Sequence, residues 1–166
     1  IFDLSSHPLV QNADVIHLHW INQGFLSLDD IKKLIRIGKP VVWTMHDMWP
    51  CTAICHYSFG CERFKKECGK CPFLSSSDKK DLSYHVFNKK RFLADSKIQL
   101  VAVSTWLRQQ AQDSALTNRL PVEVIPNVID TSLFVLSDKA EARKSLSLPL
   151  DKKIILMGAA RINDPI

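Results

Sequence analysis

Short apolar runs alternate along the chain with amphipathic or polar stretches that carry helix-capping signals. Nearly continuous apolar runs predict buried strands at residues 15–19, 41–45, 98–103, 122–125 and 154–158. Helical spacing and capping residues predict helices at about residues 28–37, 80–95, 105–113 and 138–146. This alternation predicts an α/β fold with a doubly wound, Rossmann-like parallel sheet and flanking helices.

The first predicted helix has the clearest boundaries. Ser27 is a good N-cap residue, and Asp29 follows where the helix dipole favours negative charge. Gly38 supplies a C-terminal stop, and Pro40 cannot continue the helix. Residues 15–45 therefore predict a βαβ unit with parallel strands and a right-handed crossover.

Residues 46–78 interrupt this pattern. The segment contains all five cysteines of the chain, together with two glycines and two prolines. It is too long for an ordinary connection between neighbouring elements, so we expect a cysteine-rich loop that is functional or pinned by a metal.

Parallel sheets bind ligands beyond the carboxyl ends of their strands, and this sequence carries polar and aromatic residues there. His46 and Asp47 directly follow the second strand, which makes His46 a candidate base or hydrogen-bond donor and Asp47 its candidate partner. His17 and His19 share one face of the first strand and, with Trp20, could form part of an acceptor pocket. The alternative is that these histidines are structural.

Four cysteines have a spacing that suits a metal site. They are Cys55, Cys61, Cys68 and Cys71. The last two form a C-x2-C pair, and four thiolates brought together suit a structural zinc, with His56 as a substitute ligand. The alternative is a set of free thiols in an ordered loop, and Cys51 is predicted to be a packing residue.

Two further residues lie at the ends of predicted strands. Ser104 is a predicted helix N-cap, and the backbone amides after it could also hold an anion or a sugar oxygen. Arg161 follows the last predicted strand, where a guanidinium could bind a phosphate. The sequence contains neither a glycine-rich dinucleotide fingerprint nor a P-loop.

Composition fits a folded domain, and charge indicates anionic partners. The 166 residues are 46% hydrophobic, and no apolar run reaches the ~18 residues needed to cross a bilayer, so we expect a cytoplasmic protein. The net charge is +5, with basic residues concentrated between positions 63 and 91. They suit phosphates, nucleic acid or an acidic membrane face, or form a merely solvated surface. The chain opens on Ile1, and we expect it to be part of a longer protein.

Four segments together resemble the GT4 family of retaining glycosyltransferases, which have the GT-B fold. They are residues 17–20, residues 44–50 with the cysteine-rich loop, residues 103–104 with residues 124–130, and residues 157–161. The segments follow the order found in the family and span most of the chain. Residues 46–72 resemble a subgroup found in bacterial polysaccharide gene clusters.

The resemblance implies an enzyme that transfers a hexose from a nucleoside-diphosphate sugar to a saccharide or lipid-linked acceptor, with retention and without a catalytic metal. It implies that residues 1–150 form a partial acceptor-side Rossmann-like domain and that residues 151–166 begin the donor-binding domain. The basic stretch would suit a membrane face that carries the acceptor, which implies peripheral membrane association.

The resemblance also implies roles for single residues. His46 matches the family histidine that contacts the donor sugar, and Asn127 and Asp130 match the motif that leads towards the interdomain linker. Arg161 matches the arginine that neutralises the donor diphosphate, where negative charge builds up as the nucleotide leaves. Val128 departs from the family, because it replaces a glycine in the turn between Asn127 and Asp130. Further donor-site motifs of the family are absent from this sequence, so we expect the fragment alone to be inactive.

Two other functions are alternatives. A basic zinc-knuckle module could bind nucleic acid, but the segment lacks interleaved aromatic residues, so no nucleic-acid partner is expected. Thiol redox chemistry at Cys68 and Cys71 is disfavoured, because the pair does not open a helix next to a strand.

Overall fold

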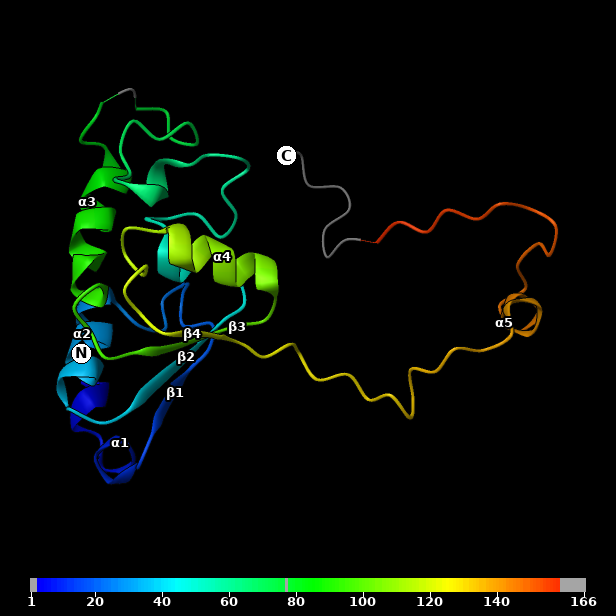
Figure 1. Ribbon diagram of the computed structural model, residues 1–166, viewed down its shortest axis with the longest axis horizontal. Coiled ribbons are helices and arrows are strands. Elements are labelled where there is room, and N and C mark those ends of the chain that lie inside the picture. Colours follow the sequence, from blue (N-terminus) through cyan, green and yellow to red (C-terminus); the bar gives the residue numbers. More distant parts are fainter. Residues whose placement is uncertain (1–2, 77, 159–166) are drawn as a thin grey trace. The chain divides into compact units, whose positions relative to one another are not determined.

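The computed structural model describes residues 3–76 and 78–158. The chain divides after Asn127 into two compact units. The first unit contains all four strands and helices α1 to α4, and the second contains α5 (Figure 1).

The first unit is built on a four-stranded parallel sheet with the order β1-β2-β3-β4. The strands are β1 (Ile16–Leu18), β2 (Val41–Met45), β3 (Gln99–Ala102) and β4 (Val122–Val124). Leu18 pairs with Trp43, and Met45 pairs with Ala102, so the carboxyl ends of neighbouring strands lie along one edge of the sheet. Four of the five predicted strands are confirmed, and with them the α/β class with a Rossmann-like parallel sheet.

The strand order differs in one respect from the doubly wound prediction. Doubly wound sheets reverse their strand order at a switch point, where ligands bind. The strands within residues 3–76 and 78–158 follow one another consecutively and contain no such reversal.

Helices precede, connect and flank these strands. The α-helices are α1 (Pro8–Asn12), α2 (Leu28–Arg36), α3 (Leu82–Lys90) and α4 (Thr105–Asp113). Short 3-10 helices span Leu4–Ser6, Trp49–Cys51, Arg63–Lys65 and Arg91–Leu93. The three longer helices were predicted, whereas α1 was not, because five residues are too few to display a helical period.

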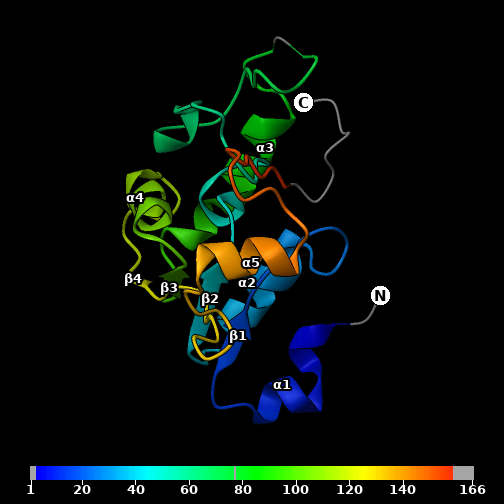
Figure 2. The same cartoon turned by 90° about the vertical axis from the view of Figure 1, so that its right-hand side faces the viewer.

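The predicted capping residues hold the helix ends. Ser27 and Asp30 form a reciprocal capping box at the start of α2, and Gly38 follows the helix with a φ of 87°. Ser104 caps α4, its Oγ accepting a hydrogen bond from the Leu107 amide at 3.2 Å. The same helix packs against β3 and β4 (Figure 2).

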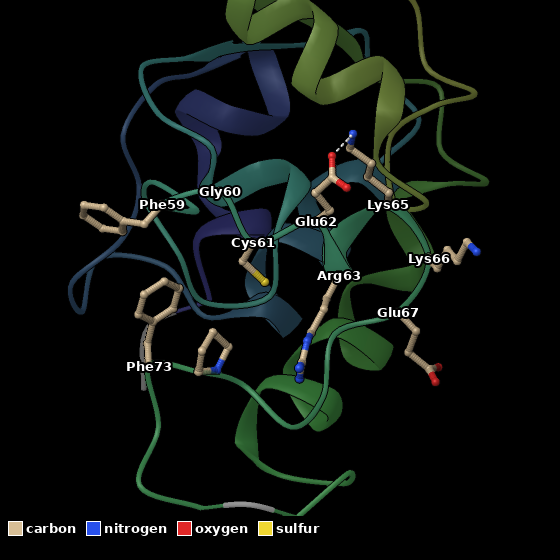
Figure 3. Close-up of a pocket in the computed structure, with 10 residues that line it drawn as sticks. Phe59, Gly60, Cys61, Glu62, Arg63, Lys65, Lys66, Glu67 and Phe73 are labelled. Atoms are coloured by element: carbon tan, nitrogen blue, oxygen red, sulfur yellow. Dashed lines mark hydrogen bonds and ion pairs between the residues drawn. The ribbon is translucent and has the colours of Figure 1, made fainter.

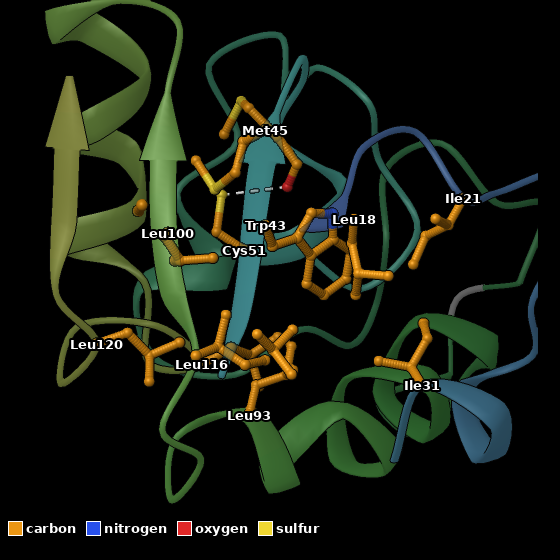
Figure 4. Close-up of a cluster of buried hydrophobic side chains, with 14 of the residues drawn as sticks. Leu18, Ile21, Ile31, Trp43, Met45, Cys51, Leu93, Leu100, Leu116 and Leu120 are labelled. Carbon is orange, nitrogen blue, oxygen red and sulfur yellow. Dashed lines mark hydrogen bonds between the residues drawn. The ribbon is translucent and has the colours of Figure 1, made fainter. Parts of the chain in front are cut away.

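The core lies around the two central strands. Trp43 and Met45 from β2 and Leu100 from β3 are at most 2% exposed, and they meet Cys51 and Leu116 from the segments around them (Figure 4). Complete burial of one such large apolar side chain is worth about 1.5–3 kcal/mol. This core fixes the sheet whose carboxyl edge carries the candidate site.

The second unit contains α5 (Lys139–Ser145), capped by Asp138, whose Oδ1 accepts from the Ala140 and Glu141 amides at 2.9 Å. The strand predicted at residues 154–158 is wrong, because these residues have no regular secondary structure and Ile155 and Leu156 are 89% and 92% exposed. A strand needs a hydrogen-bonded neighbour, and the described part of this unit contains none. The predicted domain boundary at residue 150 stays a prediction.

The described helices are too short to suggest a membrane-spanning segment. Within the described residues, no helix is long and apolar enough to cross a membrane.

Candidate active site

Parallel pairing brings the ends of β1 and β2 together. His17 lies within β1, and His19 and Trp20 follow it, while His46 and Asp47 follow β2. Because Leu18 and Trp43 are in register, the segments after the two strands leave the sheet side by side. The structure therefore joins the five residues predicted from the strand ends into one cluster.

Imidazole rings form the first half of this cluster. His19 Nδ1 and His46 Nε2 are 3.0 Å apart, and their rings stack with centroids 5.3 Å apart. A hydrogen bond between two ring nitrogens needs one protonated and one bare nitrogen, so each ring fixes the tautomer of the other. The tautomer of His19 therefore determines whether the other nitrogen of His46, Nδ1, is a hydrogen-bond donor or an acceptor.

His17 supports this pair from within the strand. Its Nε2 lies 2.9 Å from Thr44 Oγ1, and its ring centroid lies 4.2 Å from that of His19. Desolvation and the nearby His19 lower the pKa of His17, which favours the neutral form of this ring.

Asp47 forms the second half of the cluster. Its Oδ2 accepts from Trp20 Nε1 at 2.9 Å and lies 2.7 Å from His56 Nδ1. Its Oδ1 accepts from the Trp49 amide at 2.8 Å. The carboxylate thus connects Trp20, at the end of β1, with Trp49 and His56 in the cysteine-rich loop. These contacts fit a role in positioning the three side chains.

Sequence reasoning missed this position of His56, which was considered only as a substitute metal ligand. The loop returns to the strand ends, because the Met48 amide donates to the His56 carbonyl at 2.9 Å. The usable signal was a further histidine nine residues after Asp47, in a loop too long for a simple connection.

Lys90 is a second residue that sequence reasoning missed. It is fully buried at the end of α3, and its Nζ donates to the Trp49 carbonyl at 2.7 Å and to the Thr52 carbonyl at 3.1 Å. Nζ also lies 3.2 Å from the centre of the Trp49 ring. Desolvation holds the pKa of Lys90 well below its ordinary value. The side chain ties α3 to the turn that follows Asp47.

Exposed aromatic rings extend from the cluster across the loop. Tyr57 lies 5.6 Å from Trp106 and 5.0 Å from Phe59, which lies 5.7 Å from Phe73, all between ring centroids. These four rings, here called the aromatic row, are each about half exposed or more. Tyr57 directly follows His56, so the row begins beside the cluster.

A hollow of about 740 Å³ adjoins this row. Phe59 and Phe73 form one side of it, and Arg63 and Lys66 lie across from them (Figure 3). The hollow therefore offers apolar ring faces and positive charge to one ligand.

Comparison with known proteins decides the family. The family model described as Glycosyltransferase Family 4 matches residues 3–133. The chain belongs to Glycosyltransferase Family 4. The match covers all residues of the cluster and of the aromatic row.

One relative of this family 4 chain is the putative colanic acid biosynthesis glycosyl transferase WcaC of Escherichia coli (strain K12). The two are 36% identical over 72 residues, which make up 42% of this chain and 17% of the relative. The chain thus matches a small part of that relative's length. No solved structure matches the chain.

The remaining predicted site residues of this family 4 chain are Ser104, Asn127, Asp130 and Arg161. Ser104 follows β3 and serves as the cap of α4. Asn127 ends the first unit, and Asp130, in the second unit, forms a local turn in which its Oδ1 accepts from Ser132 Oγ at 2.6 Å. Arg161 lies outside the described residues. The donor-side roles of Asn127, Asp130 and Arg161 stay predictions.

All five cysteines of the family 4 chain are free thiols. Cys51 is buried and donates from Sγ to the Met48 carbonyl at 3.1 Å, which agrees with its predicted packing role. Burial raises the pKa of Cys51 to about 12, and burial with neighbouring cysteines raises that of Cys55 to about 11. In the described residues, no group of three or more His, Cys, Asp or Glu side chains is already arranged around a metal position.

Proposed function

We propose that the protein containing this chain transfers a hexose from a nucleoside-diphosphate sugar to a saccharide or lipid-linked acceptor, with retention of configuration. The supporting observation is His46, oriented by His19 at the carboxyl edge of a family 4 sheet. The printed name of the Escherichia coli relative supports an acceptor that belongs to a growing polysaccharide. The proposed place of action is the cytoplasm, at a membrane face when the acceptor is lipid-linked.

In this proposal, His46 touches the donor sugar. Its Nε2 is engaged with His19, so Nδ1 remains to bond a sugar hydroxyl. Such a hydrogen bond anchors the ring of the sugar while its bond to the diphosphate breaks. Precise placement of this kind contributes through proximity and orientation.

Asp47 acts through its neighbours. The carboxylate already accepts from Trp20 and Trp49 and pairs with His56, so we propose that it positions these residues rather than taking a proton from substrate. Trp20 and His56 would then present a fixed surface to the acceptor, with ring centroids 5.9 Å apart. His17 would support His19, which in turn holds His46.

The aromatic row is the proposed path of the acceptor. Aromatic side chains bind through their apolar faces, and the C–H faces of pyranose rings are apolar enough to lie on them. The adjoining hollow adds Arg63 and Lys66, which suit a phosphate that joins a saccharide to a lipid. Basic residues near an acidic membrane also favour peripheral association.

The donor diphosphate is proposed to meet Arg161, with Asn127 and Asp130 on the path to the donor-binding domain. Negative charge builds up on the leaving nucleoside diphosphate, and a fixed guanidinium stabilises it. The proposed catalysis needs no metal.

The test is a His46→Ala substitution in the complete gene product that contains this chain. Release of nucleoside diphosphate is measured over a panel of nucleotide sugars with a saccharide acceptor. Loss of one hydrogen-bonding group at the reacting sugar is expected to lower kcat by about 10²–10³-fold. His85→Ala, at an exposed position on α3, is the matched control and should leave kcat unchanged.

Two results contradict the proposal. One is a folded, complete protein that turns over no nucleotide sugar in the panel. The other is a His46→Ala variant with the same kcat as the unchanged protein.

A further inference from the structure

Four cysteines of the loop surround one small cavity. Cys55, Cys61, Cys68 and Cys71 all line a space of about 20 Å³, together with Arg63 and Ser83. They come from positions up to sixteen residues apart in the sequence, so the fold of the loop brings them together. Cys51, the fifth cysteine, does not line this cavity and lies in the main core.

The backbone between the last two cysteines is held in a tight turn. Gly69 has a φ of 153°, and a Cβ at this position would lie 2.3 Å from the Lys79 carbonyl oxygen, so only glycine fits. Lys70 has a φ of 48°, which places two consecutive residues in the left-handed region. The turn directs both flanking cysteines towards the cavity they line.

Charged side chains fix this turn from two sides. The buried Asp81 accepts from the Cys71 amide through Oδ2 at 2.6 Å. Arg63 donates through Nη1 to the Gly69 carbonyl at 2.6 Å and also to the Lys70 carbonyl. Both side chains thus hold the backbone of the turn, whereas no disulfide joins the thiols it presents.

The surroundings suit a complex with negative charge. A divalent ion held by four thiolates carries a net charge of −2, and backbone N–H groups and cations near the sulfurs stabilise it. The Arg63 side chain lines the cavity. Basic residues elsewhere in the loop, Lys65, Lys66 and Lys70, add positive charge.

We propose that Cys55, Cys61, Cys68 and Cys71 bind one structural Zn²⁺ as a tetrahedral tetrathiolate. The thiols do not yet converge on a common point, and binding closes them onto the ion at about 2.3 Å while each loses its proton. The ion replaces the small cavity at the centre of the loop. No transfer chemistry depends on it.

The proposed zinc has a consequence for the cluster at the strand ends. Cys55 directly precedes His56, and its carbonyl accepts from Thr52 Oγ1 at 2.6 Å. Holding Cys55 on a metal therefore fixes the backbone that delivers His56 to Asp47. Without zinc, we expect the loop to lose order first at this position.

The experiment measures metal content in the full chain, purified without a metal-chelating tag from cells grown with added zinc. We expect about one zinc per chain by elemental analysis. Cys68→Ala and Cys71→Ala should each lower the zinc content at least about fivefold, because three thiolates hold the ion less tightly. Cys51→Ala is the matched control and should keep the full content.

A second measurement protects against variants that merely fail to fold. Cys68→His replaces one zinc ligand by another, so it should retain zinc where Cys68→Ala loses it. Replacement of zinc by Co²⁺ in the unchanged chain should give the visible absorption bands of tetrahedral thiolate coordination. This readout requires no activity, so it is independent of the proposed glycosyl transfer.

Three outcomes overturn the proposal. The first is an unchanged chain that is free of zinc and gives no tetrahedral Co²⁺ spectrum. The second is zinc that stays bound in the Cys68→Ala and Cys71→Ala variants. The third is a disulfide between any two of the four cysteines in the freshly purified protein.

Discussion

The histidines at the ends of β1 and β2 differ in their surroundings, although they look alike in the sequence. His17 contacts Thr44 from within the strand, while His19 and His46 hold each other beyond it. The sequence was sufficient to predict that these side chains share one edge, because parallel strands end together. The sequence did not reveal which side chains are hydrogen-bonded to each other, because the partners depend on the orientation of each ring.

The lowered pKa of His17 predicts how stability depends on pH. The unfolded chain, with a histidine pKa near 6.5, binds a proton more readily than the folded one. The stabilisation is therefore complete above about pH 6.5 and is lost as pH falls through the lower pKa of the folded state. We expect His17→Gln to make the free energy of unfolding less steeply dependent on pH on the acid side of pH 6.5.

Urea unfolding at a series of pH values measures this dependence. His85→Gln, at an exposed position, serves as the control and should keep the original slope. If the free energy of unfolding of the His17→Gln variant depends on pH as in the unchanged protein, another group controls stability below about pH 6.5.

At the scale of elements, the apolar runs identified four strands because parallel strands bury most of their side chains, above all in the central strands β2 and β3. The same logic failed at residues 154–158, where the run is equally apolar but has no strand beside it in the described residues. An apolar run predicts that the segment is buried. Whether it forms a strand depends on a neighbouring strand to which its backbone can hydrogen-bond. Lys90 was missed for the opposite reason, since a lysine in a basic stretch is ordinarily solvated.

Lys90 provides the prediction at this scale. Lys90→Met keeps the length of the side chain but removes its hydrogen bonds to the Trp49 and Thr52 carbonyls. Because these bonds are buried and their carbonyl acceptors would be left without partners, we expect the free energy of unfolding to fall by about 2 kcal/mol. Chemical unfolding measures the change.

The neighbouring Lys89 supplies a matched control. It is exposed on the same helix, so Lys89→Met should change the free energy of unfolding by less than about 0.5 kcal/mol. If Lys90→Met is as stable as the unchanged protein, relief of the buried charge offsets the lost hydrogen bonds, and the structural role given to Lys90 is wrong.

At the scale of the whole molecule, the first unit carries its own core, sheet and candidate cluster. Its buried residues run from Ile16 to Leu120, and β4 is followed by one more sheet contact, from the Ile125 amide to the Ala102 carbonyl at 3.0 Å. The chain separates into compact units after Asn127, and the domain boundary at residue 150 that the resemblance implies stays a prediction. The family match extends past Asn127 and ends at residue 133, before residue 150.

We therefore expect a chain ended after Asn127 to fold by itself. A domain with a contiguous core unfolds cooperatively, so this shortened chain should show one sigmoidal transition in circular dichroism on heating. A gradual, non-cooperative loss of signal would show that residues beyond Asn127 are needed for the core. An end after Ala115 removes β4 and is the control that should not fold.

The hydrogen bond between Trp20 and Asp47 places a fluorescent side chain in the candidate site. The Trp20 indole is 47% exposed, bonded to a carboxylate and close to the His56 ring. Indole emission responds to water and to neighbouring polar groups, whereas Trp43, at 2% exposure, is shielded from water. A sugar settling on this surface would displace water from Trp20, and one lying along the aromatic row would displace it from Trp106, whereas Trp43 would stay untouched. Fluorescence of the exposed indole therefore reports whether a sugar occupies the site, and the buried Trp43 serves as the reference.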